Sequence, residues 1–155
     1  MKRIFIIITG LISLICLCCC SNSNKQNYHG TYTFKEVSYL SPLSSSTIDY
    51  TNEHMAGTKY IIETDLFKIE STDSTVEISS PNYVKEEITK KSAFLSDIHS
   101  IIGNEALYQY TIYNKDGNKT HWRLYVSSDC IWAATYADNT INGSEVIMRI
   151  DKLSK

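Results

Sequence analysis

Residues 108–126 read YQYTIYNKDGNKTHWRLYV, and this stretch decides the fold class. Aromatic and apolar residues fill every second position from Tyr108 to Ile112 and again from Trp122 to Val126. Alternation with a period of two is typical of strands that bury one face. The turn Lys115-Asp116-Gly117-Asn118 separates the two runs, and Asp-Gly between alternating segments marks a hairpin. The sequence therefore predicts two antiparallel strands here.

The same pattern recurs along most of the chain. Eleven tyrosines and two tryptophans, against six glycines and two prolines, suit half-buried pleated surfaces. The other predicted strands are 31–39, 59–64, 66–71, 75–79, 130–137 and 144–153. About eight strands spaced near ten residues predict one mainly β domain, an antiparallel barrel or sandwich.

Two segments depart from the period of two and predict short helices. In Ser92–Ile102 the apolar residues repeat at the helical period, Ser92 can cap the start, and Gly103 can close the end. Ser46–Ala56, with Ser46 in a capping position and Gly57 after it, is the weaker candidate.

The N-terminal residues indicate export rather than fold. Lys2 and Arg3 precede Ile4–Cys20, an uncharged run that is short for a membrane-spanning helix and ends in small residues. Leu17-Cys18-Cys19-Cys20 resembles the lipobox of bacterial lipoproteins, which implies lipid attachment at Cys20, with Cys19 as a second candidate. The alternative is a plain secretory signal with incidental cysteines.

This interpretation divides the chain into a signal peptide (1–19), a lipidated tether (20–28) and a β domain (29–155). After cleavage and lipidation Cys130 is the remaining free cysteine, so we expect no internal disulfide. The resemblance implies a lipid anchor in a bacterial membrane, the outer one if the source has two.

Composition and motifs argue against several kinds of function. A net charge of -2 and the lack of a basic stripe disfavour nucleic-acid binding. The four histidines are isolated, so no metal site is predicted, and no nucleophile elbow or phosphate loop predicts a cofactor or a catalytic residue. The acidic pair Glu86-Glu87 is interpreted as part of a solvated loop. We therefore expect a protein that is not an enzyme.

The ends of the β domain resemble those of the lipocalin-like (calycin) barrels. The domain opens with Gly30-Thr31-Tyr32, and its last strand contains Val146–Ile150 with Arg149 inside it. In that family an arginine from the last strand lies over an aromatic ring of the first strand. The resemblance thus implies that Arg149 stacks on Tyr32 at the closed end; the alternative is an outward Arg149 in solvent.

The resemblance also implies a binding cup, because about eight strands enclose room for side chains or one small ligand. The candidate residues for barrel interior or closure are Tyr32, Tyr60, Tyr110, Trp122, Trp132 and Arg149. The leading hypothesis is a lipid-anchored, non-enzymatic binding module for a small apolar ligand. The alternative is an envelope protein that blocks a hydrolase or toxin through exposed loops, its interior simply packed.

Overall fold

The computed structural model describes residues 28–106 and 108–155, and the predicted signal peptide and Cys20 lie outside this part of the chain. Its strands are β1 (Gly30–Leu40), β2 (Lys59–Ile62), β3 (Leu66–Glu70), β4 (Thr75–Ser79), β5 (Asn82–Glu86), β6 (Tyr108–Tyr113), β7 (Lys119–Val126), β8 (Ile131–Tyr136) and β9 (Ile147–Ser154). Two helices accompany them, α2 (Ile48–Met55) and α3 (His99–Ile102).

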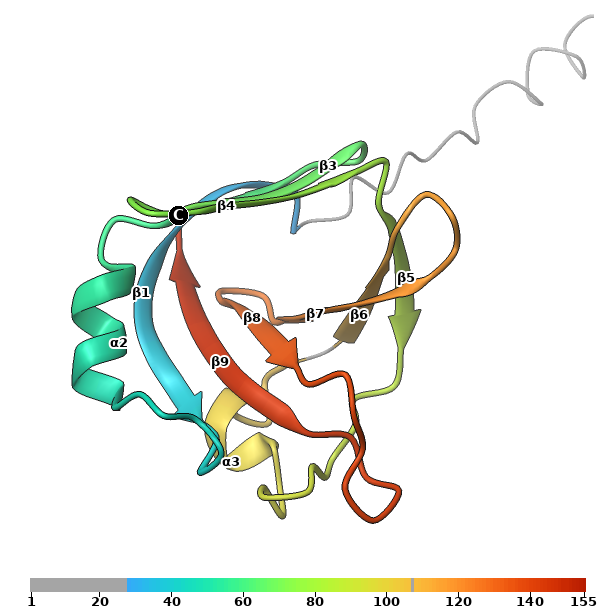
Figure 1. Cartoon of the computed structure of the whole chain (residues 1–155). Coiled ribbons are helices and arrows are strands. Elements are labelled where there is room, and N and C mark those ends of the chain that lie inside the picture. The colour runs from blue at the N-terminus through green and yellow to red at the C-terminus, as the bar shows by residue number, and fades with distance from the viewer. Residues whose placement is uncertain (1–27, 107) are drawn as a thin grey trace, which may run out of the picture.

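All nine strands belong to one antiparallel sheet that curls into a half-barrel (Figure 1). The order is β4-β3-β2-β1-β9-β8-β7-β6-β5, so β4 and β5 are the two edges. β1 pairs with β9, which brings the start of the described chain beside its end. The mainly β, antiparallel class predicted from the sequence is confirmed.

The hairpin predicted from residues 108–126 is formed by β6 and β7. Tyr110 pairs with Leu124, and Gly117 adopts a φ of 78° in the turn. A positive φ of this size suits glycine because it lacks a Cβ. The bulge after Thr111 is the one irregularity in the ladder.

The sequence missed strand β5. Residue Glu86 was assigned to a solvated loop, but it ends β5 and accepts hydrogen bonds from Thr111 Oγ1 at 2.6 Å and Gln109 Nε2 at 3.3 Å. Side chains of β6 therefore hydrogen-bond this carboxylate. With β5 included, the sheet has nine strands.

Both predicted helices are shorter than expected. Of the helix predicted over Ser92–Ile102, only one turn, His99–Ile102, is helical in the structure, and Gly103 ends it as predicted. Ser92 caps no helix, because its Oγ accepts from the backbone N–H of Ile147 at 3.0 Å. Helix α2 is capped by Thr47, whose Oγ1 accepts from Tyr50 N, and not by Ser46.

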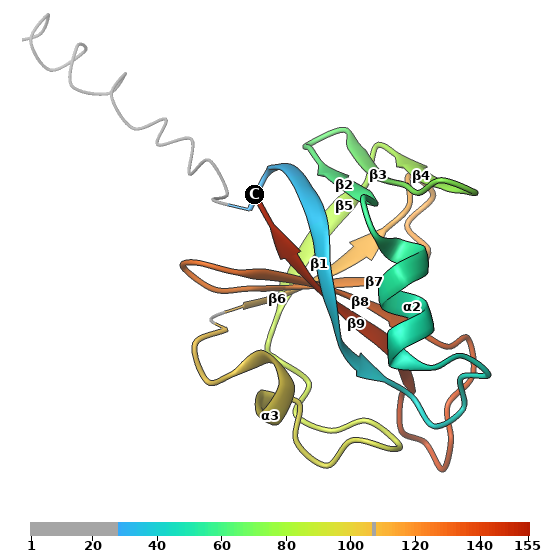
Figure 2. The same cartoon turned by 90° about the vertical axis from the view of Figure 1, so that its left-hand side faces the viewer.

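The sheet is covered on both faces over part of its width. The concave face holds the larger apolar core, whose buried residues come from α2 and from every strand except the edge strands β4 and β5. These two strands add the partly buried Ile78 and Tyr83. On the convex face α3 and its flanking loops cover β7, β8 and β9. The residues of this second core are Ile98, Ile102, Ala106, Tyr125, Trp132, Ala134, Tyr136, Ile147 and Ile150. Figure 2 shows α2 and α3 on different sides of the sheet.

Candidate ligand-binding site

The concave face is ordered into cross-strand rows by the register of β7, β8, β9 and β1. One row is Val126, Ile131, Leu153 and Phe34, and the next is Leu124, Ala133, Asp151 and Val37. The third is Trp122, Thr135, Arg149 and Leu40, which we call the cavity row. Rows on one face lie about 7 Å apart, since side chains on one face repeat every two residues.

The cavity row forms one wall of a cavity of about 320 Å³. Helix α2 and the loop before it form the opposite wall. The apolar part of the lining consists of Leu40, Tyr50, Met55, Trp122 and Met148. The remaining lining residues are the hydroxyl-bearing Ser44, Ser46, Thr51 and Thr135, together with His54 and Arg149.

Local hydrogen bonds hold α2 over this wall. Asn52 Oδ1 accepts from the backbone N–H of Val37 at 2.8 Å, where the register of β1 against β9 is irregular. The Thr47 cap starts the helix, and Ser46 Oγ lies 2.9 Å from Thr51 Oγ1. The bond from Asn52, which does not line the cavity, thus fixes α2 to β1, and the Ser46–Thr51 contact fixes the preceding loop to the helix.

A buried carboxyl group, that of Asp151, lies in the row next to the cavity row. Asp151 is 0% exposed, and its Oδ2 accepts hydrogen bonds from Tyr60 OH at 2.7 Å and Arg149 Nε at 3.0 Å. Arg149 Nε also lies 2.9 Å from Oδ1, yet Oδ1 accepts no hydrogen bond from the described residues. Arg149 and Asp151 share the concave face because they stand two positions apart in one strand.

Burial has the largest effect on the pKa values of Asp151 and Tyr60. It raises the pKa of the Asp151 carboxyl despite the opposing effect of Arg149, and it raises the pKa of Tyr60, beside that carboxylate, well above the usual value. Arg149 is 24% exposed at its side chain and lines the cavity, whereas Asp151 is sealed. The cavity is therefore lined by the cation of this pair, Arg149, and not by the anion, Asp151.

The six residues predicted for barrel interior or closure lie in different places. Trp122 lines the cavity, and Tyr60 is buried in the concave core, where its OH donates to Asp151. Tyr32 and Tyr110 are buried in the concave core near Tyr28: Tyr32 OH donates to Tyr28 O, and the Tyr28 and Tyr110 rings lie 4.3 Å apart. Tyr28, assigned to the tether, thus packs within the folded domain.

Two expectations are corrected. Trp132 lies in the convex core and not in the interior, because it alternates with Ile131 and Ala133 along β8. Arg149 does not stack on Tyr32. It pairs with Leu40, eight residues further along β1 from Tyr32, a separation of roughly 25 Å at the rise of a strand. The cation over the Tyr32 ring is Lys155, with Nζ 5.8 Å from the centroid.

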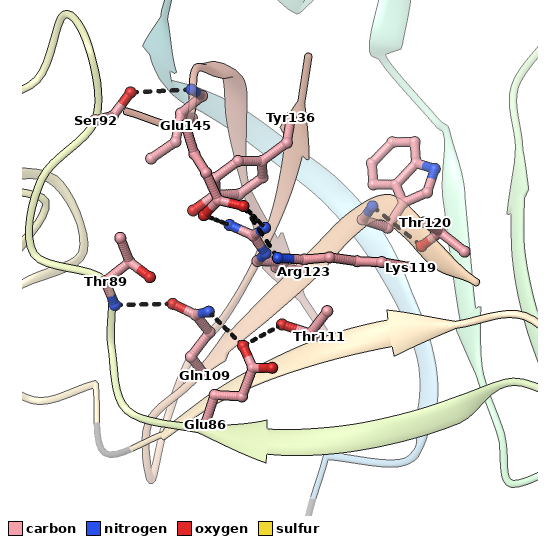
Figure 3. A network of polar contacts seen from close by, with 12 residues as sticks. Glu86, Thr89, Ser92, Gln109, Thr111, Lys119, Thr120, Arg123, Tyr136 and Glu145 are labelled. Carbon is pink, nitrogen blue, oxygen red and sulfur yellow. Dashed lines mark hydrogen bonds and ion pairs between the residues drawn. The ribbon is translucent and has the colours of Figure 1, made fainter. Parts of the chain in front are cut away.

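Sequence reasoning also missed a polar cluster on the convex face (Figure 3). Arg123, 2% exposed, donates from Nη1 and Nη2 to the two carboxylate oxygens of Glu145, and its Cζ lies 3.6 Å from the centroid of the Tyr136 ring. Lys119 Nζ adds an exposed contact to Glu145 at 3.0 Å. The cluster fastens the β8–β9 loop to the sheet.

Within residues 28–106 and 108–155, no group of three or more metal-binding side chains is gathered. In the same part of the chain no helix is both long and apolar enough to span a membrane. No protein-family model, curated protein or solved structure matches this chain. The site must therefore be interpreted from its own chemistry.

Proposed function

We propose that the protein is a lipid-anchored, non-enzymatic binding module of the bacterial cell envelope that takes up a small ligand in the cavity under α2. One observation carries the proposal: the concave face is filled with apolar side chains at one end and leaves a lined cavity at the other. A volume of about 320 Å³ lies at the lower end of the range typical of small-molecule sites. The curled antiparallel sheet is compatible with a relationship to the lipocalin-like barrels.

The position of the cavity supports uptake from the aqueous side. The described chain begins at Tyr28, beside the start of β1, and the cavity row lies at the other end of β1, about 33 Å along the strand. With a lipid on Cys20 and a short tether, the cavity would face away from the anchoring membrane.

Native mass spectrometry of protein purified from its own host tests the proposal. We expect a bound small molecule on the wild type and on Thr33→Leu, an exposed position of β1. We expect its loss from Thr135→Leu, which fills part of the cavity. A bare mass for the wild type, or a ligand retained equally by both variants, would reject the cavity as the binding site.

The anchor is tested separately. Metabolic labelling with palmitate should mark the wild type and be lost when Cys20 and Cys19 are both replaced by serine. Labelling that persists in the double variant would mean that the lipid is elsewhere, and an unlabelled wild type would leave a plain secretory signal.

A protein partner is the second candidate, and one observation favours it. Leu43, Ile48 and Tyr50 are large apolar side chains exposed by 46 to 60% in and around α2. Exposed apolar side chains that cluster often mark interaction surfaces. A hydrolase or toxin bound through this surface would appear in the same mass spectra as a stoichiometric protein, and Ile48→Lys should remove it.

A further inference from the structure

The ionisable side chains that line the cavity under α2 include basic groups but no carboxylate. The lining includes one arginine and one histidine, but no aspartate or glutamate. His54 lies 3.5 Å from Asp73, and both side chains are largely exposed, so this pair is at the rim. Arg149 is therefore the charged group that a ligand inside the cavity would meet.

The guanidinium of Arg149 carries N–H donors besides the one on Nε. Nε donates to Asp151 and the guanidinium also interacts with Tyr60, and Nη1 and Nη2 carry further N–H donors that a ligand could use. The buried carboxylate of Asp151, which also accepts from Tyr60 OH, binds Nε of the guanidinium and so restrains its position. A guanidinium presents a planar pair of donors that matches the two oxygens of a carboxylate.

A second polar group points to the same place. Thr135 Oγ1, beside Arg149 in the cavity row, is buried and has no hydrogen-bond partner among the described residues. Leaving a buried hydroxyl without a partner is unfavourable, and a ligand oxygen bound to Arg149 would lie beside Thr135 Oγ1, which could donate to it. Trp122, Met148 and Met55 add apolar surface to the lining.

We propose that this cavity binds a small organic anion: an apolar or aromatic body that carries one carboxylate, with the carboxylate oxygens on Nη1 and Nη2 of Arg149. The apolar body lies against Trp122 and the two methionines. The inference rests on the proposed binding function and adds the chemical class of the ligand. A cationic ligand is disfavoured because Asp151 is fully buried and does not line the cavity, whereas Arg149 does.

The methionines supply a reporter for the test. The chain has three, Met1 in the predicted signal peptide and Met55 and Met148 in the cavity lining. The mature, full-length protein with methyl-¹³C methionine would be titrated with benzoate, benzyl alcohol and benzylammonium, which share one ring and differ in charge. We expect benzoate to shift both methyl resonances and to bind at least about tenfold more tightly than benzyl alcohol, as one charged hydrogen bond predicts.

Two variants connect this preference to the arginine. Arg149→Gln should bring the affinities for benzoate and benzyl alcohol to within about a factor of two, whereas Lys152→Gln should keep the wild-type ratio. Lys152 is the matched control, since it is a cation of the same strand that does not line the cavity. The comparison of the three probes on the wild type stands even if Arg149→Gln does not fold.

Each contrary outcome is distinct. Equal or tighter binding of benzyl alcohol or benzylammonium would overturn the anion inference and leave the cavity as a binding site. Methyl resonances that no probe moves would also overturn the inference, while the ligand carried by the host-purified protein would still decide the proposed function. A wild-type preference for benzoate retained by a folded Arg149→Gln would remove Arg149 from the site.

Discussion

Asp151 carries a fully buried carboxyl group in the largely apolar concave face. It lies in a row whose other members are Leu124, Ala133 and Val37, and burial raises the pKa of its carboxyl. Between the ordinary pKa near 3.8 and the raised value, the folded state binds more protons than the unfolded chain. The free energy of unfolding contributed by this group is therefore complete at low pH and declines as the pH rises through the raised pKa.

Asp151→Asn should abolish this decline. Measured by urea unfolding at several pH values, the stability of the wild type relative to Asp151→Asn should fall as the pH rises from below 3.8. Because both proteins share every other carboxyl group, the difference isolates Asp151. A relative stability that stays constant or grows with pH would mean that Arg149 and Tyr60 outweigh burial.

The contribution of Glu145 to stability changes with pH in the opposite direction. Hydrogen bonding to Arg123 lowers the pKa of its carboxyl, so its contribution is present above the ordinary value and is lost as the pH falls through the lowered pKa. At neutral pH, Glu145→Gln should cost about 2 to 3 kcal/mol of unfolding free energy, because it leaves the buried Arg123 without its counter-charge.

Matched variants separate this effect from simple loss of contact. Lys119→Gln removes the exposed cation on the same carboxylate and should cost less than about 1 kcal/mol. Arg123→Leu combined with Glu145→Gln should be more stable than Glu145→Gln alone, because no unpaired charge remains buried. A double variant no more stable than the single one would contradict this account of the cluster.

At the scale of elements, α2 illustrates what a sequence can and cannot indicate. The helix was predicted at the right place, but two adjacent residues, Ser46 and Thr47, both suit an N-cap. In the structure Thr47 Oγ1 accepts from Tyr50 N at 3.3 Å, while Ser46 Oγ contacts Thr51 Oγ1. Only the path of the preceding loop decides between them.

Thr47→Ala should therefore destabilise the protein by about 1 kcal/mol, the usual cost of a lost N-cap. Thermal unfolding followed by circular dichroism would measure the change. Ser46→Ala, which keeps the cap, should cost less, and the reverse ranking would assign the cap to Ser46.

Residues 92–102 and 82–86 show how tertiary contacts override the secondary structure that local sequence patterns predict. The helical period in 92–102 exists because Leu95, Ile98 and Ile102 face the convex core. The backbone before α3 is instead tied elsewhere: Ala93 N donates to Glu145 O, and Ser92 accepts from Ile147. Glu86 was assigned to a loop because its partners, Thr111 and Gln109, are distant in sequence. By contrast, β4 was predicted at its observed bounds because turn residues flank it on both sides.

The site was predictable only in part, for a similar reason. Alternation placed Trp122 on a strand face with Leu124 and Val126, and the structure puts all three on the concave side. Arg149 was singled out as an unusual charge in an apolar strand, but its partner was misassigned. The useful signal was local: Asp151 follows Arg149 by two positions, so the pair shares a face. The cavity itself depends on how α2 lies over four strands, which no periodicity encodes.

At the scale of the whole molecule, one curled sheet separates two environments. The convex core contains Trp132 beneath α3, and the concave side contains Trp122 at the cavity. The two tryptophans of the chain thus report independently on the two faces. A ligand under α2 should change the surroundings of one indole and not of the other.

The most direct test of the cavity is acrylamide quenching of single-tryptophan variants purified from the native host. Trp132→Phe leaves Trp122 as the emitter, and Trp122→Phe leaves Trp132. After unfolding, removal of small molecules and refolding, quenching of Trp122 should increase because its cavity has been emptied, while quenching of Trp132 should stay the same. Quenching of Trp122 that is identical before and after this treatment would contradict the assignment of the cavity under α2 as the ligand site.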